Sequence, residues 1–438
     1  MSALADRLRG VIRPLVEGGS EDPPLHRSDH GDHHDAAEVL GGEWREARGQ
    51  RFLVVDRKYA PGYRHGRVAL ADCLPPDTGI WPRLHLLGCG ADLLGCRAAL
   101  CGPPSQSGKL LFLDLETTGL AGGAGTYAFL VGCGWFDGAT FRLRQFFLSN
   151  FGAERALLES VAELAAGTAC VVTYNGKSFD LPLMETRFVL QRMPTPFADM
   201  PHVDMLHPAR RLWREDDVEC RLTNLERTLC GHEREGDVPG FEIPSRYFRY
   251  VRSGDARSLE GVLEHNRLDI ISLAMFTARA SQLLDDGPAE ALTAREALGM
   301  GRLYERAGMT AEALEAFERA AQAYTDDISR AEALRAHATL CRRLRRYEAA
   351  ASSWRRILEL RACSAAIARE ATEALAVHHE HRERDLNAAK TFALRSLQLQ
   401  ATAARQQAVQ YRLARLDRKM GSQPAIDRPS QSLFPLES

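Results

Sequence analysis

Apolar and polar positions divide the chain into a central part with short apolar runs and a C-terminal part with helical periodicity. Residues 110–115 and 169–174 are apolar runs bounded by glycine, threonine or asparagine, which is typical of buried strands that end in turns. Over residues 259–273, apolar side chains recur at spacings of three and four, which predicts a helix. Residues 51–101 hold shorter alternating runs broken by proline and glycine, and these predict a small β-rich module.

The C-terminal part is predicted to be helical almost throughout, and its pattern repeats. The first repeat alternates small and aromatic residues as a tetratricopeptide repeat does, at Gly301, Tyr304, Gly308, Ala313, Phe317 and Ala320. A weaker copy lies 37 residues later, at Ala338, Cys341, Ala350, Trp354 and Ile357. A degenerate third unit is indicated by Ala389, Phe392 and Leu397. Stacked helix pairs would form a concave groove for a protein segment or nucleic acid, and a plain helical bundle is the alternative.

These patterns predict five segments along the chain. We expect a flexible N-terminal segment over 1–50, a small β-rich module and linker over 51–107, an α/β domain over 108–284, tetratricopeptide-like repeats over 289–420, and a disordered tail over 421–438. The sequence Asp-Asp-Gly-Pro at 285–288 marks the exit from the α/β domain.

Acidic residues are placed at the ends of the predicted elements. Asp114 and Glu116 are two apart at the end of the first strand, so their side chains share one face. Asp180 follows the second strand in a predicted first helical turn, and His265 and Asp269 lie one turn apart on the predicted helix. Two carboxylates about 4 Å apart repel by ~4 kcal/mol at an effective dielectric near 20. A cluster of such groups therefore calls for a bound cation, although any one acid alone is more often a solvated surface group.

The three motifs carry a resemblance to a known family. Asp-x-Glu at 114–116, Asn-x-x-x-Phe-Asp at 175–180, and a histidine three intervening residues before Asp269 resemble the exonuclease motifs of the DEDD superfamily. From about Leu110 to Met275 the amino-acid sequence is similar to that of the YprB-type ribonuclease H-like branch. In some relatives this domain is followed by tetratricopeptide-like repeats. The resemblance implies a mixed sheet flanked by helices, two metal ions, and phosphodiester hydrolysis from a 3′ end.

The same resemblance implies a role for each acidic residue. Asp114 would bridge two ions, and Glu116, Asp180 and Asp269 would complete their ligand shells. Ligands that are all oxygen suit Mg²⁺, and Mn²⁺ is possible with the same set. His265 would act as general base because imidazole titrates near neutral pH. Its spacing from Asp269 is that of the tyrosine subclass of the superfamily, so the alternative is that His265 caps or packs the helix.

Further residues are weaker candidates for substrate binding. The glycine-rich turn after the first strand could bring backbone N–H groups to the terminal nucleotide, or it is an ordinary turn. Basic and amide side chains after the second strand could contact phosphate, or they form a solvated face. The candidates are Thr117, Thr118, Gly119, Asn175, Lys177, Arg210 and Arg211.

Composition limits the possibilities further. The 438 residues are 45% hydrophobic and 26% charged, as in ordinary soluble globular proteins. A net charge of −2 gives no general attraction to nucleic acid, so binding would depend on local patches and on metal. No signal peptide or membrane segment is predicted, and the ten cysteines contain no C-x-x-C pair, so we expect a cytoplasmic protein.

Two functional hypotheses follow from the sequence. The first is a metal-dependent 3′-to-5′ exonuclease acting on DNA or RNA, whose repeats recruit a protein partner or the substrate. The second is a nucleic-acid-binding or protein-interaction scaffold with little or no catalysis. The acidic quartet favours the first, because a scaffold gains nothing from carboxylates that repel one another in one pocket.

Overall fold

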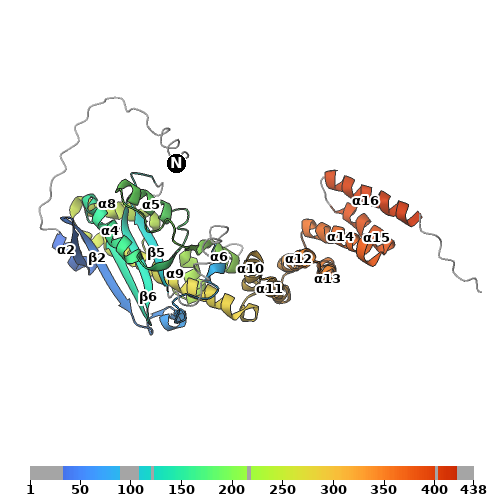
Figure 1. Ribbon diagram of the computed structural model, residues 1–438, viewed down its shortest axis with the longest axis horizontal. Coiled ribbons are helices and arrows are strands. Elements are labelled where there is room, and N and C mark those ends of the chain that lie inside the picture. Colours follow the sequence, from blue (N-terminus) through green and yellow to red (C-terminus); the bar gives the residue numbers. More distant parts are fainter. Residues whose placement is uncertain (1–32, 89–107, 120–122, 215–218, 400–402, 422–438) are drawn as a thin grey trace, which may run out of the picture.

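The structure is a computed structural model that describes residues 33–88, 108–119, 123–214, 219–399 and 403–421. An α/β part is followed by a row of helices that extends away from it (Figure 1). The N-terminal residues 1–32, the linker at 89–107 and the tail from 422 lie outside the described residues, so the predictions made for them stay predictions.

The α/β part is built on a seven-stranded sheet with the order β1-β2-β7-β6-β5-β8-β9. The strands are β1 Glu43–Ala47, β2 Gln50–Tyr59, β5 Lys109–Thr117, β6 Ala128–Asp137, β7 Thr140–Phe147, β8 Thr168–Thr173 and β9 His202–Asp204. Strands β1, β2, β7, β6 and β5 pair antiparallel with their neighbours, whereas β5 pairs parallel with β8 and β8 with β9. The predicted mixed sheet is therefore confirmed.

Helices cover both faces of this sheet, and the alternation of residues along β5 shows why. Leu111 and Leu113 are buried in the core shared with α4 and α5, whereas Leu110 and Phe112 are buried in the core that contains α9. A strand that is apolar on both faces is stable only when both are covered. The helices of this part are α2 His33–Leu40, α4 Glu154–Ala165, α5 Asp180–Leu190, α6 Leu206–Leu212, α7 Leu222–Leu225, α8 Ile243–Ser253 and α9 Glu260–Asp286.

The long helix α9 lies very close to the sheet. Gly132 and Gly134 on β6 face it, and a Cβ atom at either position would collide with the side chain of Ile270. At Gly132 the added atom would also collide with Asn266. Because Gly132 pairs with Asp114 on β5, this close approach brings the N-terminal half of α9 beside that aspartate.

The N-terminal strands differ from the sequence-based expectation of a separate module over 51–107. β2 lies in the central sheet, where Leu53 pairs with Phe147, whereas β3 Arg64–His65 and β4 Val68–Ala69 form a small sheet of their own. Part of the segment 1–50, expected to be flexible, is also ordered as α2 and β1. The physical reason is that Ala36 and Leu40 are buried in the core.

The helical part is formed by successive antiparallel pairs. Its helices are α10 Ala294–Arg306, α11 Thr310–Ala323, α12 Asp327–Arg343, α13 Tyr347–Glu359, α14 Ala365–His378, α15 Leu386–Gln398 and α16 Ala403–Gly421. A left-handed residue stands in the turn within each of the first three pairs: Gly308, Arg345 and Arg384 have φ of 79°, 59° and 59°. In the first pair a Cβ at Gly301 would press against the ring of Phe317, which explains the small residue facing an aromatic one.

The first helical pair is attached to the α/β part. Helix α10 packs on α6, and a Cβ at Gly299 would collide with the carbonyl of Arg211. The indole Nε1 of Trp213 donates a hydrogen bond of 3.0 Å to Oε1 of Glu296. Among the helices that the structure describes, none has both the length and the apolar character needed to span a membrane.

Candidate active site

Strand β5 positions the first two acidic residues. Asp114 and Glu116 pair with Gly132 and Leu130 of β6, and the register shifts between Glu116 and Thr117. This irregularity ends the regular ladder directly after Glu116. Glu116 is buried, and Asp114 is partly buried beside α9. The predicted strand-end location of both carboxylates is therefore what the structure shows.

Asp180 stands at the first position of α5, after a turn that follows β8. The carboxylate of buried Asp204 shapes this turn, because it accepts hydrogen bonds from the backbone N–H groups of Asn175 at 2.7 Å and Lys177 at 3.1 Å. Asn175 has a φ of 67°, a left-handed conformation that asparagine tolerates better than most residues. The turn thereby returns the chain so that α5 starts beside β5.

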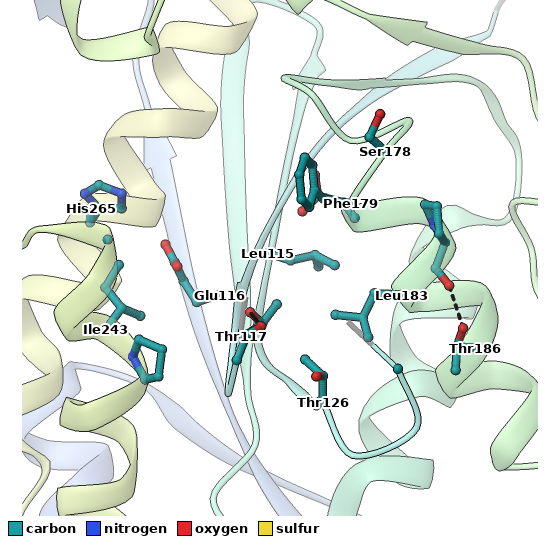
Figure 2. A pocket seen from close by; sticks show the side chains of 16 residues that line it. Leu115, Glu116, Thr117, Thr126, Ser178, Phe179, Leu183, Thr186, Ile243 and His265 are labelled. Atoms are coloured by element: carbon teal, nitrogen blue, oxygen red, sulfur yellow. Dashed lines mark hydrogen bonds between the residues drawn. The ribbon is translucent and has the colours of Figure 1, made fainter. Parts of the chain in front are cut away.

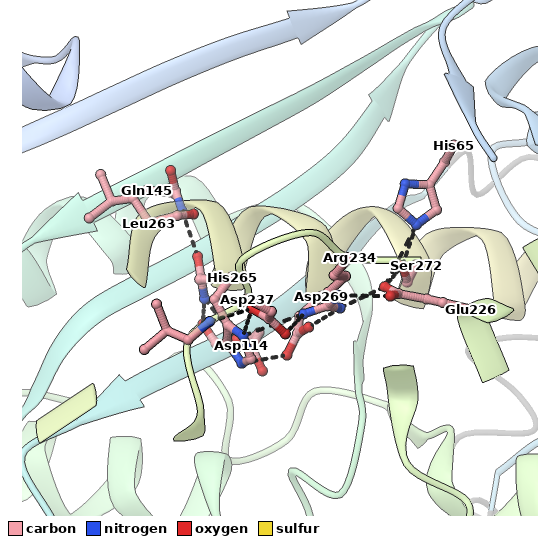
Figure 3. A network of polar contacts seen from close by, with 12 residues as sticks. His65, Asp114, Gln145, Glu226, Arg234, Asp237, Leu263, His265, Asp269 and Ser272 are labelled. Carbon is pink, nitrogen blue, oxygen red and sulfur yellow. Dashed lines mark hydrogen bonds and ion pairs between the residues drawn. The ribbon is translucent and has the colours of Figure 1, made fainter. Parts of the chain in front are cut away.

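Helix α9 contributes His265 and Asp269, which lie one turn apart on one face with Nε2 of His265 3.6 Å from Oδ2 of Asp269 (Figure 3). Between them, Asn266 is fully buried and its Nδ2 donates a 2.8 Å hydrogen bond to Oδ2 of Asp114. Gln145 on β7 donates a 2.9 Å hydrogen bond to Oδ1 of Asn266. This chain of side chains fixes the carboxylate of Asp114 against the helix.

Burial, and then the charge of nearby carboxylates, raises the pKa of the acidic residues at this site. Burial, together with the charges of Asp269 and Asp180, raises the pKa of Asp114 well above its usual value. Burial and then the charges of Asp114, Asp269 and Asp180 do the same to the pKa of Glu116. Burial raises the pKa of Asp180 to about 7, with added contributions from Asp204 and Asp269. A cluster of buried oxygen ligands that disfavours its own ionisation is suited to a hard divalent cation.

The carboxylates are near one another without forming a closed cage. Among the described residues, no three of the four place their oxygens within 4.8 Å of one another. Mutual repulsion opposes closer approach, so gathering the four around an ion requires rotation of side chains. The donor set nevertheless fits Mg²⁺ or Mn²⁺, since all the ligand atoms would be oxygen.

A buried arginine that the sequence analysis did not single out holds Asp269. Arg234 is 4% exposed, and its Nη2 lies 2.5 Å from Oδ1 of Asp269. The same guanidinium donates to both carboxylate oxygens of Glu226, at 2.7 and 2.6 Å. Burial raises the pKa of Asp269, and the charges of Arg234 and His265 offset part of that rise. Oδ1 of Asp269 is thus occupied, and Oδ2 faces His265.

A cavity of about 480 Å³ opens beside two of the four carboxylates (Figure 2). It is lined by Glu116, Asp180 and His265 on its polar side, and by apolar side chains from α5 and α8 elsewhere. Phe179 lines this cavity and is 59% exposed. The volume is within the range of small-molecule sites, about 300–1,000 Å³.

The weaker candidates are distributed unevenly around this cavity. Thr117 and Gly119 line it, whereas the hydroxyl of Thr118 accepts a 2.9 Å hydrogen bond from the backbone of Tyr127 and serves the turn. Asn175 and Lys177 do not line the cavity. Arg210 and Arg211 lie on α6, which packs on α10, and they do not line it either. Thr117 and Gly119 are therefore the substrate-binding candidates that the geometry supports.

Three contributors to the site were missed from the sequence: Asn266, Arg234 and Asp237. Asn266 could have been noticed, because it follows His265 and precedes Asp269 by less than one turn. Arg234 and Asp237 lie in the segment Arg-Glu-Gly-Asp, whose charges and glycine read as a solvated turn. Nothing local to that segment indicates that it packs against α9.

A separate group of possible ligands lies in the helical part. Glu348, His378 and Glu383 offer ligand atoms within 4.8 Å of one another. Glu383 already accepts a hydrogen bond of 2.7 Å from Arg355 and lies 2.8 Å from Nδ1 of His379. These pairings account for the group as an ion-pair network, so we assign it no role.

Comparisons with known proteins agree with the fold of this part of the chain. Residues 111–280 match the model of the RNase_H superfamily. The chain is 29% identical over 376 residues to the uncharacterized protein YprB of Bacillus subtilis (strain 168), a match that covers 84% of this chain and 86% of YprB. The family B DNA polymerase of the hyperthermophilic archaeon Pyrobaculum calidifontis is 16% identical with a TM-score of 0.27, over 45% of this chain and 29% of the polymerase. That last likeness is too low to carry an argument.

Proposed function

We propose that the ribonuclease H-like domain formed by residues 111–280 is a metal-dependent nuclease that removes nucleotides from the 3′ end of DNA or RNA. Proteins of this superfamily act on nucleic acids and typically depend on divalent metal, which makes the fold compatible with such an activity. The observation that carries the proposal is the convergence of three separate elements, β5, α5 and α9, on one cavity. Glu116, Asp180 and His265 line this cavity, and the charges of Asp269 and Asp180 act on Asp114 next to them.

Asp114, Glu116, Asp180 and Asp269 would hold two Mg²⁺ ions, or Mn²⁺ in their place. When bound, the ions would activate water and neutralise the charge that grows on the phosphate. The protein's own contribution is positional: Asn266 fixes Asp114, and Arg234 fixes Asp269. Such supporting contacts set the orientation of ligands before a cation arrives.

His265 is proposed as the general base. It lines the cavity, and its Nε2 faces the cluster at 3.6 Å from Asp269 while its Nδ1 is engaged elsewhere. Burial alone would lower the pKa of His265, but the hydrogen bond to Asp237 and the charge of Asp269 outweigh it and raise that pKa. A stronger base positioned beside the metal site suits proton removal from attacking water.

The cavity is proposed to receive the terminal nucleotide. Phe179 presents an exposed ring at the entrance, and aromatic rings stack on any nucleobase with ~1–3 kcal/mol per base. Thr117 and Gly119 also line the cavity, and Figure 2 shows Thr117 next to Glu116. A pocket bounded by α5 on one side and α8 on the other suits the end of a strand better than its middle.

The helical part is proposed to be a set of tetratricopeptide-like repeats that recruit a protein partner or the nucleic acid. The support is the recurrence of a left-handed turn residue at Gly308, Arg345 and Arg384, 37 and then 39 residues apart. Each turn connects two antiparallel helices, as in repeats that stack into a curved array.

The experiment that tests the proposal follows strands labelled at the 3′ or the 5′ end, of both DNA and RNA, with Mg²⁺ or with EDTA. We expect single nucleotides released from the 3′ end by the wild type, and at least a 100-fold lower rate for Asp114→Asn. A terminal 3′ phosphate or an internal label separates exonucleolytic from internal cleavage. Strand binding without cleavage of any substrate by the wild type would instead support the scaffold hypothesis.

A further inference from the structure

The segment between η5 (Glu226–Cys230) and η6 (Gly240–Glu242) crosses the face of α9 that carries the candidate base. Within it, Asp237 points its side chain at the imidazole of His265, with Oδ1 2.6 Å from Nδ1 (Figure 3). Asp237 is one fifth exposed, so it is neither a core residue nor a free surface acid. The proposed function leaves this contact without an explanation.

Both oxygens of Asp237 are engaged. Oδ1 also accepts a 2.9 Å hydrogen bond from the backbone N–H of Val238, and Oδ2 lies 3.3 Å from Nη1 of Arg234. Arg234 is itself immobilised by Glu226, whose carboxylate is further bonded to the hydroxyl of Ser272. The aspartate therefore cannot rotate away from the imidazole without breaking these bonds.

The 2.6 Å contact with Asp237, much shorter than the 3.4 Å approach of Arg234 Nη1 to the same nitrogen, favours a proton on Nδ1 of His265. An ionised carboxylate can only accept, so Nδ1 of His265 must donate to Asp237 in the 2.6 Å contact. In the neutral ring Nε2 then holds a lone pair, and Nε2 is the atom that faces Asp269 and the cavity. Without Asp237 the ring could rotate about its side-chain bonds or carry its proton on the other nitrogen.

We propose that Asp237 is a positioning residue that fixes the tautomer and orientation of His265 for proton transfer in the nuclease reaction. The inference rests on the proposed function, and it adds a residue to that site which neither the motifs nor the comparisons indicate. Arg234 connects the two halves of the arrangement, because one guanidinium contacts both Asp237 and Asp269. The proposed base and one proposed metal ligand are thereby fixed in position relative to each other.

A double-mutant cycle tests the proposal. Asp237→Asn, His265→Ala and the double variant are compared with wild type on a short 3′-labelled strand at saturating Mg²⁺. We expect Asp237→Asn to lower kcat about 10- to 100-fold with KM and melting temperature unchanged, because it removes orientation and no substrate contact. In the His265→Ala background the second substitution should change kcat less than twofold, because Asp237 acts only through that imidazole.

Matched measurements separate this role from a structural or ligand role. Asp255→Asn, which removes an exposed carboxylate paired with Arg257, is the control and should keep the wild-type rate. Mn²⁺ affinity, measured by electron paramagnetic resonance, should stay within about threefold of wild type in Asp237→Asn. Asp237→Ala serves as a second variant should the asparagine form misfold.

Three results would overturn the positioning role, and a fourth would refute the proposed function itself. Full kcat in both Asp237 variants, or losses that multiply in the double variant, would overturn the positioning role. A kcat loss that follows a loss of Mn²⁺ affinity would also overturn it, in favour of a role at the metal. An inert wild type would instead refute the proposed nuclease function, and the inference would fall with it.

Discussion

The carboxylates of the site are buried or partly buried, and two of them are held by a polar neighbour. Asn266 bonds to Asp114, and Arg234 pairs with Asp269, whereas Glu116 has desolvation and four like charges against it. Such a group of acids destabilises the folded protein when no cation is bound. The same repulsion is the source of affinity for a divalent cation, because binding relieves it.

Asp180 gives a pH-dependent prediction for the metal-free protein. Its pKa is raised, mainly by burial, to about 7 in the folded state from the usual 3.8, so the folded protein binds this proton more tightly than the unfolded chain. Ionisation of Asp180 therefore does not lower the free energy of unfolding below pH ~4. Its destabilising effect grows until pH ~7, where it reaches up to about 4 kcal/mol. Urea unfolding in EDTA should show stability that falls over this window, and Asp180→Asn should flatten the fall. Parallel curves for the two proteins would contradict the account.

At this scale the sequence predicted the acidic residues proposed as metal ligands, but not the residues that hold them in position. Asp114, Glu116 and Asp180 are readable because each follows an apolar run that ends in a turn. Arg234 is not readable, since its partners Glu226 and Asp269 are brought to it by the packing of α9. A charged segment that lies at the surface and one that contributes to a buried ion pair can have the same local sequence.

At the scale of elements, the site depends on the distance between α9 and the sheet. Glycines on β6 allow the helix to approach closely, and the helix carries His265, Asn266 and Asp269 on the side that faces β5. The sequence predicted β5, β8 and α9 because their apolar periodicities are local. It did not place β2 in the central sheet, because the pairing of Leu53 with Phe147 is set by long-range register. We propose that the nuclease unit includes β1 and β2.

Gly132→Ala tests the role of this close approach. The added methyl group would collide with Asn266 and Ile270, so we expect a loss of about 1–3 kcal/mol in unfolding free energy from overpacking. Nuclease activity should fall at least 10-fold, because the helix that holds Asp269 is displaced. Gly62→Ala, where nothing lies within 4 Å of the added atom, is the control for urea unfolding and activity. Equal unfolding free energies and equal activities of the two variants would show that the distance between α9 and the sheet is not critical.

At the scale of the whole molecule, the helical part is continuous with the α/β part. A single apolar core runs from Leu70 through α9 into the helical pairs as far as Leu375. Trp213 bonds to Glu296 across the junction, and Arg306 donates 2.9 Å hydrogen bonds to the carbonyls of Leu86 and Gly88. The sequence predicted two regions and could not predict their attachment, because the contacting residues are far apart along the chain.

Trp213→Phe should reveal this attachment. It removes one buried hydrogen bond and leaves the carboxylate of Glu296 less satisfied, which costs about 1–2 kcal/mol. Because the junction is shared, hydrogen exchange should accelerate in both α6 and α10, whereas the control Tyr411→Phe, at an exposed side chain, should change neither. Faster exchange confined to one side would mean that the two regions unfold independently.

The central claim is that residues far apart in the chain form one divalent-metal site, and anomalous diffraction from crystals grown with Mn²⁺ tests it most directly. The account predicts manganese peaks contacted by Asp114 and Glu116, with Asp180 and Asp269 turned toward them, and loss of these peaks in Asp114→Asn. Crystals saturated with Mn²⁺ that show no peak among these four side chains would contradict it.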